Sequence, residues 1–152
     1  MPKLRSFLKS WLPVLVWMAV IFSASGDRAS LQHSSRLIGP IVHWLFPQAS
    51  EATLHEVIVA VRKGAHLTEY AILALLIWGA LRNRAEPPPR PWQWSTAAST
   101  VLLVMLYAAS DEIHQHFVPS REASVVDVLI DTTGGALAML LLWVGGRVFR
   151  RW

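Results

Sequence analysis

The chain has 152 residues, of which 53% are hydrophobic and 16% are charged, whereas soluble domains carry about 25% charged residues. This length fits a single domain, residues 1–152, and the absence of cysteine excludes disulfides, a thiolate nucleophile and a cysteine-ligated zinc site. The net charge of +4 alone would be compatible with nucleic acid, but the apolar segments and the distribution of the basic residues indicate a membrane protein without a nucleic-acid partner.

The first predicted element is an apolar segment at about residues 8–25. Lys3, Arg5 and Lys9 precede or begin it, and it ends with the small residues Ser23-Ala24-Ser25. A basic head, an apolar middle and a small-residue end are also typical of a signal peptide. Because three more apolar segments follow, an uncleaved first membrane span is the simpler interpretation.

Residues 26–61 are predicted to form a mixed connection outside the membrane. The apolar positions of 31–46 have helical spacing, which indicates a helix lying along the membrane surface, interrupted at Pro40 and Pro47. A packed surface loop with one or two short helices explains the same pattern. The sequence leaves both interpretations open, and it leaves open whether residues 28–46 cover a site as a lid.

Three further spans are predicted at about residues 62–81, 95–110 and 124–144. A span needs about 20 residues, and the second and fourth reach that length only if their polar starts are included. Those polar starts are therefore expected to lie below the membrane surface. The predicted fold class is all-α, a four-helix transmembrane bundle.

The basic residues predict the orientation of this bundle. Nine of the fourteen Lys and Arg residues lie at the N-terminus, between the second and third spans, and at the C-terminus. The positive-inside rule then predicts that both termini are cytoplasmic. The connection at 26–61 and the loop at 111–124 would both face outward, which gives the bundle a polar cluster at its outer face.

Polar side chains recur at the outer ends of three spans, and helical spacing aligns them within each span. The candidate binding residues are Arg62, Lys63, His66, Tyr70, Asp111, Glu112, Gln115, Arg121, Asp127 and Asp131. Glu69 shares the stripe of Arg62 and His66. Asp131 lies one turn deeper than Asp127, where an unpaired charge is costly, so it needs a partner from the cations of that side: Arg62, Lys63 or Arg121. Two interpretations remain open, an ion-pair network that docks the helices and a polar pocket open to the outer surface.

The cluster contains residue types that can bind a metal, but the chain lacks HExxH and any regular His spacing. Its serines lie outside any nucleophile-elbow motif. We therefore predict no metal and no cofactor. Gly134-Gly135-Ala136 is predicted to be a surface of close helix packing, since small residues let spans approach one another.

The segments RKGAHLTEYAIL and SDEIHQHFVPSREASVVDVLIDTTGG resemble the VanZ-like family of small bacterial membrane proteins. FSAS at the end of the first span resembles the Phe-Ser element of that family, without its following Gln. Ser120 stands where the family often has Gly, and Asp131 where it often has Asn, which adds a negative charge. The residues to which the resemblance points are Lys63, His66, Tyr70, Asp111, Glu112, Gln115, Arg121, Asp127 and Gly134.

The resemblance implies a multi-pass protein of the bacterial cytoplasmic (inner) membrane, in contact with the lipid bilayer. Founding members of the family are associated with resistance to the glycopeptide teicoplanin, by a mechanism that is not settled. An effect on antibiotic resistance is thus an expectation taken from the family and not from the residues.

Two functions of different classes are compatible with this cluster. In the first, the outward pocket binds or modulates an anionic, lipid-linked cell-wall intermediate of the cell envelope, with Arg62, Lys63 and Arg121 facing phosphate. In the alternative, the protein is a membrane-embedded enzyme acting on a lipid head group, with His66, Glu112 and Asp127 as the catalytic candidates for acid/base chemistry. One cavity lined by these three residues and Arg121 would favour the enzyme, whereas carboxylates each closed off by Arg or Lys would favour a structural clamp. A transporter fits less well, because no polar path crosses to the cytoplasmic side.

Overall fold

The computed structural model describes residues 2–25, 31–48, 50–82, 92–117 and 124–149. Within these ranges the chain forms five helices and no strand, which confirms the predicted all-α class. The helices are α1 (Pro2–Ala24), α2 (Leu31–Leu45), α3 (Glu51–Arg82), α4 (Trp94–His116) and α5 (Val125–Val148). Of the helices in the described ranges, four are long and apolar enough to cross a membrane, namely α1, α3, α4 and α5.

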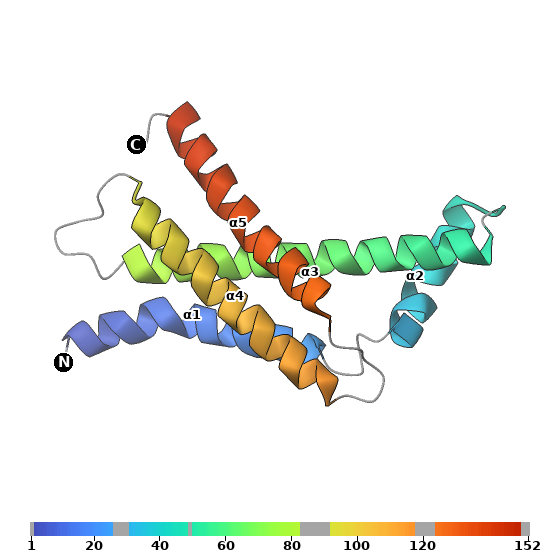
Figure 1. Cartoon of the computed structure of the whole chain (residues 1–152), viewed down its shortest axis with the longest axis horizontal. Coiled ribbons are helices and arrows are strands. Elements are labelled where there is room, and N and C mark those ends of the chain that lie inside the picture. Colours follow the sequence, from blue (N-terminus) through green and yellow to red (C-terminus); the bar gives the residue numbers. More distant parts are fainter. Residues whose placement is uncertain (1, 26–30, 49, 83–91, 118–123, 150–152) are drawn as a thin grey trace.

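The longest helix is α3, with 32 residues, which corresponds to about 48 Å. Figure 1 shows α1, α4 and α5 beside the C-terminal part of α3, and α2 against its N-terminal part. The helix begins at Glu51, well before the predicted start of the second span at residue 62. The intervening residues contain neither Pro nor Gly, so nothing in them ends the helix.

The four long helices alternate in direction. The start of α1 and the end of α5 lie at one end of the bundle, and the ends of α1 and α4 meet the start of α5 at the other end (Figure 1). This arrangement brings the polar segments of α3, α4 and α5 together, as we expected from their helical spacing and from four spans of alternating direction. It also brings the end of α1 to the same place.

In the connection before α3, the described residues form one helix, α2, at the residues where a surface helix was one of the two interpretations. Pro40 lies inside this helix and does not end it, contrary to the prediction. The described helix ends two residues before Pro47. Val42 of α2 is buried, whereas Ile41 and Trp44 are exposed, so α2 has one packed face and one apolar open face.

Two glycines of α5 permit close helix packing. A Cβ atom on Gly134 would overlap the backbone carbonyl oxygen of Leu67 in α3, and one on Gly135 would lie 2.9 Å from Val104 Cγ1 in α4. The predicted packing surface is therefore confirmed at these two positions. It does not extend to Ala136, which is exposed.

The outer surface of the long helices is apolar. Exposed leucines occur along α1, α4 and α5, whereas soluble proteins rarely expose apolar patches of such extent. The interior of the bundle is centred on Tyr70, Leu73 and Val104, which are completely buried. Apolar side chains therefore lie both inside and outside the bundle, as expected for helices in contact with a lipid bilayer.

Candidate functional site

Asp111 of α4 joins three helices at the polar end of the bundle. Its side chain is only 2% exposed, and its Oδ2 atom accepts three hydrogen bonds. Ser25 Oγ donates at 2.6 Å, Gln115 Nε2 at 3.1 Å and Tyr70 Oη at 3.2 Å. Since these donors come from the residue after α1, from α4 and from α3, the carboxylate holds the three helices together.

Glu112 lies next to Asp111 and helps to cap the start of α5. The backbone N–H of Ser124 donates to Glu112 Oε2 at 2.8 Å, and Ser124 Oγ in turn accepts from the N–H of Val126 at 3.2 Å. The first N–H groups of a helix have no partner within the helix, and a negative charge there is favourable. Glu112 is 5% exposed and acts as part of this cap. Asp127, in the first turn of α5, is half-buried.

His66 of α3 is the ion-pair partner of Asp131. The distance from His66 Nδ1 to Asp131 Oδ1 is 3.4 Å, with 22% of the histidine side chain exposed and none of the aspartate side chain. Asp131 therefore has a partner, as its depth required, but among the described residues this partner is His66 and neither Arg62 nor Lys63, while Arg121 lies outside them. Gly134 lies one turn after Asp131 and allows α5 to approach α3 closely enough for this contact.

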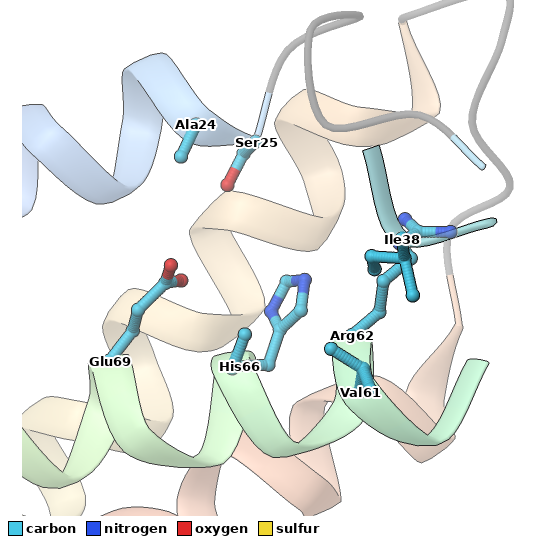
Figure 2. A pocket seen from close by; sticks show the side chains of 8 residues that line it. Ala24, Ser25, Ile38, Val61, Arg62, His66 and Glu69 are labelled. Carbon is cyan, nitrogen blue, oxygen red and sulfur yellow. The ribbon is translucent and has the colours of Figure 1, made fainter. Parts of the chain in front are cut away.

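A cavity of about 170 Å³ opens beside this cluster, between the end of α1, α2 and α3. Figure 2 shows three charged or polar side chains of α3, those of Arg62, His66 and Glu69, directed to the side on which Ser25 and Ile38 lie. The residues that line the cavity are Ala24, Ser25, Ile38, Val61, Arg62, Ala65, His66 and Glu69.

Besides the Ser25–Asp111 bond, two side-chain hydrogen bonds hold the C-terminal half of α1 against the rest of the bundle. Trp17 Nε1 donates to the backbone carbonyl of Glu69 at 2.9 Å, and Tyr107 Oη donates to the backbone carbonyl of Met18 at 2.6 Å. One bond fixes α1 to α3 and the other fixes it to α4. Together they place Ser25 at the wall of the cavity.

The predicted site residues fall into four groups. Arg62 and His66 line the cavity, and five residues are buried and do not line it: Tyr70, Asp111, Glu112, Gln115 and Asp131. Lys63 is exposed, and neither it nor Asp127 lines the cavity. Arg121 lies outside the described residues.

The structure does not fully meet either of the two conditions stated in the sequence analysis, the one for an enzyme or the one for a structural clamp. Of the three catalytic candidates only His66 lines the cavity. Within the described residues, the hydrogen-bond and ion-pair partners of Asp111, Glu112 and Asp131 are hydroxyl, amide, backbone N–H and imidazole groups, and not Arg or Lys. The same part of the chain contains no group of three or more His, Asp or Glu side chains arranged to hold a metal ion.

Sequence reasoning missed Ser25 and the contribution of α2. The FSAS segment contained the signal for Ser25, but the Phe-Ser pair in it draws attention to Ser23, which is exposed and donates to the carbonyl of Ala19 in its own helix. Glu69 was placed on the correct stripe without being chosen as a site residue. Ile38 could not be placed, since the position of α2 depends on its packing against α3.

A family model described as VanZ/LLP1 matches residues 10–149. No curated protein and no solved structure matches the chain. The match covers nearly the whole sequence, including α1 from residue 10 onward, the other three membrane-capable helices in full and every residue of the cluster. The chain therefore belongs to the VanZ/LLP1 family and is a VanZ-like membrane protein.

Proposed function

We propose that the cavity binds the anionic phosphate in the head group of a lipid-linked component of the cell envelope. The observation that carries this proposal is the position of Arg62 and His66, two groups able to donate hydrogen bonds to phosphate, on the wall of one cavity. The protein would be a single domain that crosses the bacterial cytoplasmic (inner) membrane four times. Both termini would be cytoplasmic and the cavity would lie near the outer face, in agreement with the excess of basic residues at the other end.

The size of the cavity limits what it can hold. Pockets for drug-sized molecules have volumes of about 300–1,000 Å³. The cavity, at about 170 Å³, has room for one phosphate and its neighbouring group but not for a complete sugar-peptide head group. We therefore expect recognition of the part of the ligand closest to the membrane. Altered glycopeptide susceptibility would follow if binding changes the access of the antibiotic to such an intermediate.

Replacing Arg62 by Gln is expected to weaken binding of a short-chain polyprenyl phosphate about tenfold, or about 1.4 kcal/mol. The reason is the loss of a charge-assisted hydrogen bond from a side chain that lines the cavity. The dissociation constant would be measured by native mass spectrometry of the full chain, purified in detergent, with the corresponding uncharged polyprenol as the reference ligand.

Lys63→Gln provides the matched control for this experiment. Lys63 is the next residue of α3 and carries the same charge, but it is exposed and does not line the cavity. Loss of a non-specific attraction to anionic lipid would affect both variants alike. Equal affinities of the two variants, or equal binding of phosphate and polyprenol, would contradict the proposal.

The pairing of His66 with Asp131 favours one second candidate, an enzyme that acts on the bound head group. A carboxylate near Nδ1 of a histidine orients the ring and leaves Nε2 to exchange a proton with a substrate. The histidine lines the cavity and the aspartate lies completely behind it. In this function His66 is the general base or acid and Asp131 is its positioning residue.

If the protein is an enzyme, His66→Gln should lower turnover of a polyprenyl-phosphate substrate by a factor of about 10² to 10⁴. Asp131→Asn should lower it less and change its pH profile, because the asparagine keeps the shape of the aspartate but not its charge. Product formation would be followed by mass spectrometry on the reconstituted full chain. Unchanged lipid after incubation with the parent protein, under conditions where binding is measured, would exclude this candidate.

A further inference from the structure

We infer that the ligand of the cavity is a zwitterionic head group, with its phosphate at the Arg62 end and an ammonium group at the Glu69 end. This inference rests on the proposed function, because it specifies the ligand of the same cavity. Arg62 and Glu69 are seven residues apart on α3, which separates their backbone positions by about 10.5 Å along the helix axis. Figure 2 shows Arg62 at the end of the cavity beside Ile38 of α2, and Glu69 at the end below Ala24 and Ser25.

Because Ser25 already donates its hydrogen, it can only accept hydrogen bonds from a ligand at the Glu69 end of the cavity. A serine hydroxyl has one hydrogen and two lone pairs. Ser25 donates its hydrogen to Asp111 Oδ2 at 2.6 Å, so only lone pairs remain for a ligand. An ionised Glu69 is likewise an acceptor and not a donor. A phosphate oxygen would be repelled at this end, whereas an N–H donor would be bound.

The buried carboxylates favour a positively charged donor over a neutral hydroxyl. Asp111 lies directly behind Ser25, and three donors converge on its Oδ2 atom, an arrangement suited to a carboxylate that carries its charge. Its Oδ1 atom is buried and has no hydrogen-bond partner within the described residues. In surroundings of low dielectric constant such a charge acts over several ångströms. An ammonium group at the Glu69 end therefore gains attraction that a hydroxyl does not.

The geometry of the α1 end is fixed well enough to discriminate between ligands. The bond from Trp17 Nε1 to the carbonyl of Glu69 joins α1 to the residue that would face the ammonium group. The bond from Ser25 to Asp111 joins the end of α1 to α4. The hydroxyl of Ser25 and the backbone of Glu69 are thus held in place before a ligand arrives, which lowers the entropic cost of binding.

The test compares three short-chain lipids that differ only in the group attached to the phosphate: dihexanoyl phosphatidylethanolamine, dihexanoyl phosphatidylglycerol and dihexanoyl phosphatidic acid. Dissociation constants would be measured by native mass spectrometry on the full chain and on Glu69→Gln and Arg62→Gln. We expect the parent to bind the ethanolamine lipid about tenfold more tightly than either of the others. Glu69→Gln should remove this preference without weakening the binding of phosphatidic acid, and Arg62→Gln should weaken all three.

Each other outcome has a distinct meaning. If the parent binds all three lipids equally and Arg62→Gln weakens all of them, the zwitterion inference is wrong while phosphate binding stands. If the glycerol lipid binds as tightly as the ethanolamine lipid, the ligand needs a hydroxyl donor and the ammonium assignment is wrong. If Arg62→Gln changes nothing, the proposed function fails and the inference fails with it. The comparison of lipids on the parent chain needs no variant, so a poorly folded Glu69→Gln would not prevent the test.

Discussion

Replacing Gly134 by Ala is expected to lower the free energy of unfolding by about 3 kcal/mol, at the upper end of the range for overpacked cores. The added Cβ would overlap the carbonyl oxygen of Leu67 and lie 3.0 Å from its carbonyl carbon. Both atoms belong to the backbone of α3, so no side-chain rotation can relieve the contact. Thermal unfolding of the full chain in detergent would measure the loss.

Gly79→Ala and Gly145→Ala are the controls for this substitution. Both glycines lie in long helices, and an added Cβ at either position would meet nothing within 4 Å. Their unfolding temperatures should match that of the parent or rise slightly, because Ala favours helix over Gly by about 1 kcal/mol. A Gly134→Ala protein as stable as these controls would show that α3 and α5 do not pack as closely as described.

Asp111→Ala is the second change with a large expected effect, a loss of about 3 kcal/mol or more in the free energy of unfolding. The substitution leaves three donors, on Ser25, Tyr70 and Gln115, without their acceptor. Each buried polar group left without a partner costs about 1–3 kcal/mol. Because the three donors belong to different parts of the bundle, the end of α1 should also separate from α3 and α4, which limited proteolysis would detect near residue 25.

Asp111→Asn is the matched variant, since its amide oxygen can still accept from the same donors. It should unfold close to the parent while losing the negative charge behind Ser25. The pair separates structure from chemistry: Asp111→Ala tests the role of the acceptor, and Asp111→Asn tests the role of the charge. If the alanine variant were as stable as the asparagine variant, the three hydrogen bonds would contribute little to the bundle.

Helical spacing predicted the stripe on α3, but it could not divide that stripe into two surfaces. At about 100° per residue, Tyr70 lies about 80° around the helix from Arg62, whereas Glu69 lies within about 20° of it. That difference is enough to turn Tyr70 toward Asp111 and Glu69 toward the cavity. Periodicity within one helix predicts a face, and only the neighbouring helices decide which edge of that face becomes buried.

The partner of Asp131 illustrates the same limit. Burial predicted that this carboxylate needs a partner, and long cationic side chains were the obvious candidates. The structure instead brings α5 so close to α3 at Gly134 that the shorter side chain of His66 reaches it. The two glycines were visible in the sequence, but the helix against which each packs depends on crossing angles that one sequence does not reveal.

The length of α3 has a consequence for how a lipid would reach the cavity. His66 lies sixteen residues before Arg82, about 24 Å from that end of the helix, and this distance is shorter than the thickness of a hydrocarbon layer, about 30 Å. If the Arg82 end lies at the inner boundary of that layer, as in the proposed orientation, the mouth of the cavity would lie below the aqueous phase, and a lipid could diffuse into it sideways from its own leaflet with its tail still among the other tails. Occupancy would then follow the surface density of that lipid in the leaflet, and a scarce lipid confined to two dimensions could fill the cavity where a soluble analogue at the same overall amount would not.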